Sequence, residues 1–223
     1  MDDRRRKFLV RLLAGAGMLS GLSRLSVRSA AAMGQHPQGV RKIEGSAAIN
    51  GQPVQMGDIV SVGDTVTTGP DGTVIFVVEA AVFLLRESTR LTLTRDRIDE
   101  STSVDGIRLL KGKMLGVFSR RRRKRLLTPS AVVGIRGSGV YTEVDPETTY
   151  LCTCYGHSAI KSLAAPQNRE SVTTRHHEAP RYIDAAGRIR PAPVVNHTDA
   201  ELILLESLAG RRPPFVQSES HGY

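Results

Sequence analysis

Two cysteines separated by a single residue, Cys152 and Cys154, are the side chains of this 223-residue chain whose type and spacing best suit chemistry. Residues two apart on a β-strand face the same side, so a strand here presents both thiols together. As thiolates they can bind a soft metal ion, and as close neighbours they can form a strained disulfide. They can also pack as two small, half-buried apolar groups. All three interpretations stay open from the sequence.

Histidines provide further candidate ligands. His157 follows the pair closely, and other histidines, His197 among them, lie in a later polar segment. No spacing matches a known metal motif, so half of the ligands must come from elsewhere in the chain. The sequence therefore requires no cofactor, and it predicts a metal or redox site from Cys152, Cys154, His157, His176 and His177.

Signatures of enzymes are absent from the sequence. His176-His177-Glu178 matches part of a zinc-protease motif, but the second histidine is missing and Pro180 would break the helix that the motif needs. No Gly-x-Ser-x-Gly, phosphate loop or dinucleotide fingerprint occurs. We therefore expect a protein that is not an enzyme.

The first 32 residues read as an export signal. Arg5 and Arg6 precede Phe8 and Leu9, a short glycine-rich apolar run follows, and Ala30-Ala31-Ala32 provides a cleavage site. The arginine pair resembles the twin-arginine (Tat) type of bacterial signal, which exports proteins already folded in the cytoplasm. This predicts a periplasmic or secreted protein that loads any cofactor before export. No later apolar run approaches the length of a membrane span, so none is expected after cleavage.

Positive charge is concentrated in one place. The signal holds seven Lys/Arg and two Asp, so the formal charge of +9 falls to +4 in the mature chain. A single run supplies six positive charges: Arg120, Arg121, Arg122, Arg123, Lys124 and Arg125. We expect a loop that contacts an acidic surface, such as lipid phosphate or an acidic protein face, or else a solvated hairpin tip. The scarcity of aromatic residues and the balanced remainder argue against a nucleic-acid partner.

Strand and turn signals predict an all-β domain over residues 43–163, after a spacer at 33–42. Asn50-Gly51 is a hairpin turn, Arg90–Thr94 alternates apolar and polar residues, and Ala131–Ile135 has the composition of a buried strand. Regular short spacing with glycine turns suits a solenoid-like or a sandwich architecture. A narrow core of Val, Ile and Leu agrees with the low aromatic content.

Residues 164–223 form a predicted C-terminal extension that is irregular apart from one helix at about 199–209. Thr198 and Glu201 have the spacing of a capping box, and Gly210 is a natural stop. Short strands are also possible at Tyr182-Ile183 and Val194-Val195. A short helix is not stable alone, so we expect its leucines to pack on the β domain.

About half of the chain, from Ile49 to Ile160, resembles the FecR domain. The matching segments are Asn50-Gly51, Gly57-Asp58, Gly63-Asp64, Gly69–Gly72, Leu110–Lys113 and Thr128-Pro129 leading to Val133–Tyr141, where Ser138 stands in place of the family's threonine. The resemblance implies an extracytoplasmic all-β domain used for protein contacts in signalling. Established regulators of this family carry a cytoplasmic helical segment and a transmembrane helix, where this chain has a predicted signal.

The resemblance and the residues together predict an exported binding or signalling module that contacts an envelope protein. Because the cytoplasmic segment is replaced, the anti-sigma role is not expected to transfer. The alternative hypothesis is a metal-binding or thiol-redox periplasmic protein centred on Cys152 and Cys154.

Overall fold

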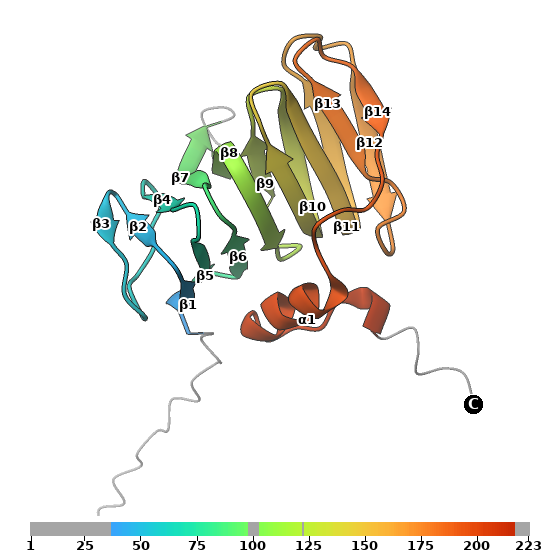
Figure 1. The fold of residues 1–223 in the computed structure, drawn as a ribbon. Coiled ribbons are helices and arrows are strands. Elements are labelled where there is room, and N and C mark those ends of the chain that lie inside the picture. Colours follow the sequence, from blue (N-terminus) through green and yellow to red (C-terminus); the bar gives the residue numbers. More distant parts are fainter. Residues whose placement is uncertain (1–36, 98–102, 122, 217–223) are drawn as a thin grey trace, which may run out of the picture. The chain divides into compact units, whose positions relative to one another are not determined.

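The structure is a computed structural model that describes residues 37–97, 103–121 and 123–216. The signal residues Arg5, Arg6, Phe8 and Leu9 lie outside these ranges, as does Arg122 of the basic run. The strands and the helix of the described part, in chain order, are β1 (Gly39–Glu44), β2 (Ala47–Ile49), β3 (Gln52–Pro53), β4 (Thr65–Thr68), β5 (Thr73–Val78), β6 (Ala81–Leu85), β7 (Arg90–Arg97), β8 (Ser103–Val117), β9 (Lys124–Leu127), β10 (Ala131–Val144), β11 (Thr148–Ser162), β12 (Arg169–Thr174), β13 (Arg181–Asp184), β14 (Ile189–Pro191) and α1 (Asp199–Leu208). The all-β prediction with one C-terminal helix is confirmed (Figure 1).

Three long strands, β8, β10 and β11, each take part in two halves of one folded sheet. The first half has the order β3-β2-β4-β7-β8-β9-β10-β11-β12. The second half has the order β1-β5-β6-β8-β10-β11-β13-β14. All of these pairs are antiparallel except β8 with β9, and the sheet is not closed. This pairing agrees with the sandwich of the two predicted architectures.

Glycines mark the points where the three long strands bend from one half of the sheet to the other. Gly112, Gly137 and Gly156 have φ angles of +90°, +62° and +91°. A Cβ atom on Gly156 would lie only 2.6 Å from the carbonyl oxygen of Gly137. Residues with side chains rarely adopt this backbone, so glycine is required for the fold of the sheet.

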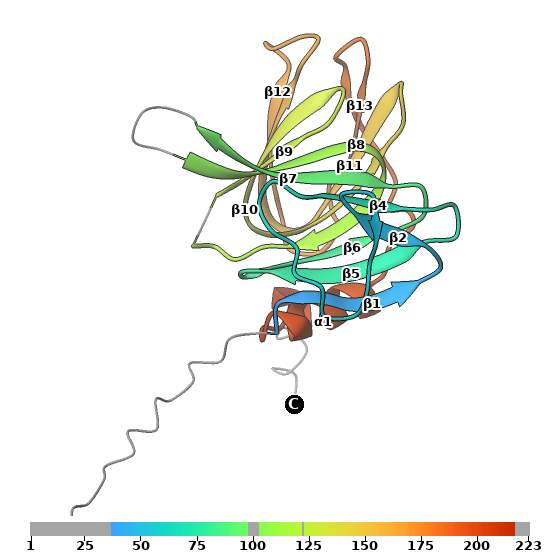
Figure 2. The same ribbon diagram turned by 90° about the vertical axis from the view of Figure 1, so that its left-hand side faces the viewer.

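One core lies between the two halves of the sheet. Val66 and Ile107 contribute to it from the first half, and Phe76 and Met114 from the second, all essentially inaccessible to solvent. Side chains alternate along a strand, so the opposite face of the second half needs cover of its own. That cover is α1, which contacts β6 and β8 and lies on the side of the sheet away from β7 (Figure 2), together with the segment leading to α1, which lies on Tyr141 of β10 and Tyr150 of β11.

Helix α1 starts as the sequence predicts. The Thr198 side chain accepts a hydrogen bond from the Glu201 N–H, and Glu201 reaches back to the Thr198 N–H. Leu202 and Leu205 are fully buried against the sheet, which confirms that the leucines pack on the β domain. The described residues contain no helix long and apolar enough to cross a membrane.

Regular structure extends beyond the limits expected from the sequence. Strand β1 begins at Gly39, inside the expected spacer at 33–42, and β12 to β14 lie inside the extension expected to be irregular. A strand at Tyr182-Ile183 is confirmed as part of β13, whereas Val194-Val195 is not in a strand. Pairing with β5, β11 and β13 supplies the backbone partners that weak local patterns do not reveal.

Candidate metal centre

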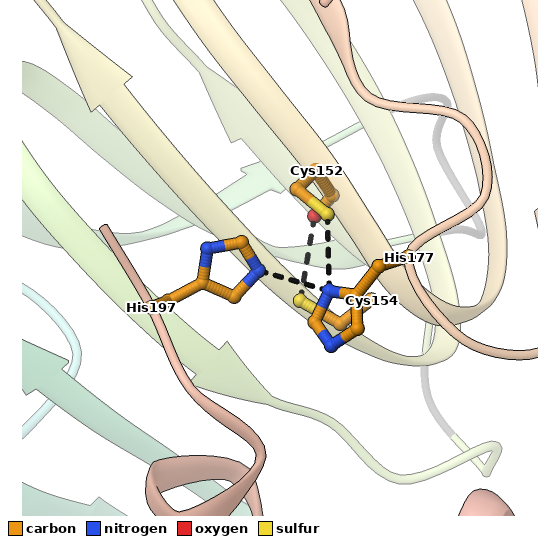
Figure 3. Close-up of side chains that lie close together, drawn as sticks. All are labelled: Cys152, Cys154, His177 and His197. Atoms are coloured by element: carbon orange, nitrogen blue, oxygen red, sulfur yellow. Dashed lines mark hydrogen bonds between the residues drawn. The ribbon is translucent and has the colours of Figure 1, made fainter. Parts of the chain in front are cut away.

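Four potential metal ligands meet in the layer between the second half of the sheet and the C-terminal segment. They are Cys152, Cys154, His177 and His197, and their ligand atoms all lie within 4.8 Å of one another (Figure 3). Both cysteines are free thiols with no exposed surface, and the histidines are partly buried. The structure therefore contains the metal-ligand set of Cys₂His₂ sites, assembled from three separate segments.

Strand β11 supplies the two sulfur atoms. Cys152 and Cys154 alternate with Thr153 and project from the face of the sheet that the C-terminal segment covers. The sequence prediction that both thiols face one way is therefore confirmed. Burial is deeper than expected, because α1 and its leading segment complete the cover over this face.

His177 comes from the loop between β12 and β13. Its backbone has a φ of +56°, a left-handed conformation that is uncommon outside glycine. The N–H of His177 donates to the carbonyl oxygen of Cys154 over 2.9 Å, which attaches the loop to β11. As a result, Nδ1 of His177 lies 3.4 Å from Sγ of Cys152.

His197 comes from the segment between β14 and α1. Its ring stacks on Tyr141 with centroids 4.5 Å apart and planes inclined by 20°. Arg86 donates to the carbonyl oxygen of the preceding residue, Asn196, and also pairs with Glu201 of the helix. These contacts fix the segment so that Nε2 of His197 lies 3.0 Å from Nδ1 of His177.

The spacing fits a tetrahedral ion. With zinc–sulfur bonds of about 2.3 Å and zinc–nitrogen bonds of about 2.0 Å, ligand atoms lie about 3.3–3.8 Å apart. The nitrogen–sulfur distance of 3.4 Å and the nitrogen–nitrogen distance of 3.0 Å are close to those values. Only small movements of side chains would bring all four atoms to bonding distance.

The outward nitrogens of both rings have fixed partners. Nε2 of His177 lies 3.1 Å from a carboxylate oxygen of Asp199, and Nδ1 of His197 lies 2.6 Å from the carbonyl oxygen of Val195. Both acceptors require a hydrogen on the ring nitrogen that faces them, so in neutral rings the inner nitrogens carry lone pairs. Two lone pairs facing each other repel, and either a proton on one of the two nitrogens or a metal ion between them removes the repulsion. Metal-bound histidines have this same arrangement of outer acceptors.

Charge in the cluster is arranged to favour a cation. The hydrogen bond from Cys154, helped by His177 and His197, lowers the pKa of Cys152 to about 4. Burial raises the pKa of Cys154. Burial also acts to lower the pKa of His177, but its contacts with Cys152 and Asp199 outweigh burial and raise it. The protein alone therefore favours a thiolate beside an imidazolium, and a divalent metal would also ionise the second thiol.

The cluster contains part of the predicted set and one residue outside it. Cys152, Cys154 and His177 come together as predicted, whereas His157 binds the Thr173 hydroxyl over 3.0 Å elsewhere on β11. His176 lies beside the cluster and contacts Asp199 at 2.9 Å. His197 was only a nearby histidine in the sequence, and no local spacing identified it.

The basic run is divided by the structure. Arg120, Arg121 and Arg123 are exposed in a loop, but Lys124 and Arg125 begin β9. Lys124 is buried and pairs with Asp105 at 2.5 Å. The loop expected over residues 120–125 therefore ends at Arg123, because Lys124 is buried in β9 and pairs with Asp105.

No protein-family model and no curated protein matches this chain. Two crystal structures of a candidate anti-sigma factor from Parabacteroides distasonis ATCC 8503 are similar to it. One has a TM-score of 0.46 and 11% identity over 57% of this chain and 58% of that chain. The other has a TM-score of 0.48 and 11% identity over 64% of each chain. The match spans less than two thirds of those proteins, and similarity this low has no bearing on function.

Proposed function

We propose that this chain binds one tetrahedral metal ion, most suitably Zn²⁺, through Cys152, Cys154, His177 and His197. The observation that carries the proposal is the convergence of two sulfur and two nitrogen ligand atoms within 4.8 Å. Zinc accepts this ligand set, and four protein ligands leave no open position for a substrate. The ion is therefore structural and not catalytic, in agreement with the lack of enzyme motifs.

The ion would join three segments that the sheet alone leaves separate. Cys152 and Cys154 belong to β11, His177 to the loop after β12, and His197 to the segment that leads into α1. A metal in this place ties α1 and its leading segment to the second half of the sheet. The outer partner Asp199 is the first residue of α1, so the helix itself supports the site.

Metal analysis of the purified protein tests this assignment. We expect about one zinc ion per chain, and almost none in the Cys152→Ser variant, because a hydroxyl is a poor zinc ligand. His157→Gln is the matched control, since His157 is on the same strand but outside the cluster, and it should keep full metal content. Metal-free wild-type protein with two titratable thiols would instead favour the thiol-redox alternative.

We further propose that the metal-bound domain is an exported, non-enzymatic binding or signalling module of the FecR type that contacts another envelope protein. The FecR-like motifs support this, because their glycines Gly112 and Gly137 are bend residues of the long strands. The twin-arginine features support periplasmic export. Tat export of a folded protein also agrees with a buried metal, which would be bound in the cytoplasm.

The export route has its own test. Replacing both signal arginines, Arg5→Lys and Arg6→Lys, should leave the precursor in the cytoplasm, because the Tat receptor requires the pair. Cell fractionation followed by immunoblotting measures the result. Arg24→Lys is the control, since Arg24 lies outside the pair and should not affect export. Unchanged export of the double variant would exclude the Tat route.

A further inference from the structure

A cavity of about 750 Å³ lies next to the metal cluster, on the side where His176 and Asp199 line it. Its walls come from the bend of β10, the middle of β11, the end of β12 and the segment after α1. This volume is within the range of about 300–1,000 Å³ that is typical of sites for small molecules. The metal ligands themselves do not line the cavity, so it is a separate site.

Positive side chains converge on this cavity. Arg120, Arg136 and Arg175 line it, and none of the three forms an ion pair with a carboxylate of the described residues. Other arginines nearby are neutralised, as Arg211 is by Glu206 at 2.5 Å. An arginine presents a planar set of donors that matches phosphate and carboxylate oxygens. The lining of the cavity therefore contains three such guanidinium groups.

Negative charge within the lining is already engaged. Asp199 is the acidic residue among the lining residues, and its carboxylate contacts His176 at 2.9 Å and His177 at 3.1 Å. With two thiolates, a bound Zn²⁺ has no net charge from ion and sulfurs together, so the metal centre does not offset the arginines. The lining therefore has three arginines and one carboxylate that is already bound by histidines, an arrangement that suits an anion.

One wall of the cavity is aromatic. The rings of Phe215 and Tyr155 line it, with centroids 6.0 Å apart and planes inclined by 62°. Phe215 also lies against the ring of His176 with a centroid distance of 4.6 Å. Such a wall favours a ring or another apolar group attached to the anion, because aromatic faces pack well against flat groups.

We infer that this cavity binds a small organic anion: a phosphate or carboxylate group held by Arg120, Arg136 and Arg175, attached to a flat apolar group that packs on Phe215. The cavity is half open, and its volume of about 750 Å³ suits a small molecule better than an extended acidic protein surface. The site makes use of Arg120, the first residue of the basic run, while the buried Lys124 is unavailable to it. The inference does not depend on the metal.

Isothermal titration of the purified mature protein with phenyl phosphate, in the presence and absence of zinc, tests the inference. We expect saturable binding at one site per chain, tighter than that of inorganic phosphate because only phenyl phosphate can use the apolar wall. Because Arg136→Gln removes a charge-assisted hydrogen bond to the anion, it should weaken binding by about 10–100-fold. The double variant with Arg120→Gln should weaken it further. Arg120 and Arg136 are not among the four proposed metal ligands, so the zinc content of these variants should stay unchanged.

Arg190→Gln is the matched control, because Arg190 is an exposed arginine on β14 that does not line the cavity. It removes the same charge and should leave affinity within about twofold. Absence of saturable binding by phenyl phosphate would overturn the inference, and so would equal losses in the Arg136 and Arg190 variants. Equal affinity for inorganic phosphate would overturn the role of the apolar wall. If any of these binding results failed while the protein still contained zinc, the metal proposal would be unaffected.

Discussion

Removal of the proposed zinc ion is expected to lower the melting temperature of the protein by about 8–16 °C. A ligand present at 1,000 times its dissociation constant stabilises the folded state by about 4 kcal/mol. In a domain of 150–250 residues, each kcal/mol corresponds to about 2–4 °C. The ion would join β11, the loop holding His177 and the segment holding His197, so its loss should release α1 in particular. Calorimetry with and without a strong chelator measures the shift.

Two variants make this result specific to the proposed ligands. Cys152→Ser should show the low melting temperature in both conditions, because it has no metal to lose. Asp199→Asn leaves the four metal ligands in place but removes the carboxylate that contacts His177 and His176, and loss of such an outer partner reduces metal affinity by about 10–100-fold. Its metal-dependent stabilisation should therefore fall by about 1.4–2.7 kcal/mol. If neither zinc nor the chelator changed the melting temperature of the wild-type protein, this result would contradict a structural metal.

Replacement of Arg211 by methionine is expected to destabilise the fold by about 2–4 kcal/mol. Its partner Glu206 is a buried carboxylate whose side chain is only 4% exposed, and it is held by Arg211 at 2.5 Å and by the hydroxyl of Tyr155. Breaking a buried pair costs about 3–5 kcal/mol because one charge stays unpaired. Because the side chain of Arg211 is 28% exposed, we expect a destabilisation somewhat smaller than that range. Arg211 also donates to the carbonyl oxygen of Ala80, which links the end of α1 to the turn between β5 and β6.

Urea denaturation of matched variants measures this contribution. Arg212→Met removes a neighbouring exposed arginine and should change stability by less than about 0.5 kcal/mol. Adding Glu206→Gln to Arg211→Met should recover more than half of the loss, because a neutral amide can still bond to Tyr155. If Arg211→Met and Arg212→Met were equally mild, the buried pair would have no stabilising role.

Local features of this protein were predictable because short-range chemistry decides them. Alternation in β11 places Cys152 and Cys154 on one face whatever the strand pairs with. The capping box at Thr198 and Glu201 determines where α1 begins, since its hydrogen bonds join neighbouring residues. The all-β class likewise follows from regularly spaced strand and turn signals. Each of these features involves residues close together in the chain.

The site itself was decided by tertiary structure. His177 and His197 reach the cysteines only because β12 and β13 pair with β11 and because Tyr141 and Arg86 hold the segment before α1. His157 is closer to the cysteines in sequence but contacts Thr173 instead, so proximity along the chain does not identify the histidines of the cluster. Lys124 similarly became an interior partner of Asp105. These outcomes depend on contacts between distant segments, whose geometry is determined by packing of the whole sheet and not by local residue patterns.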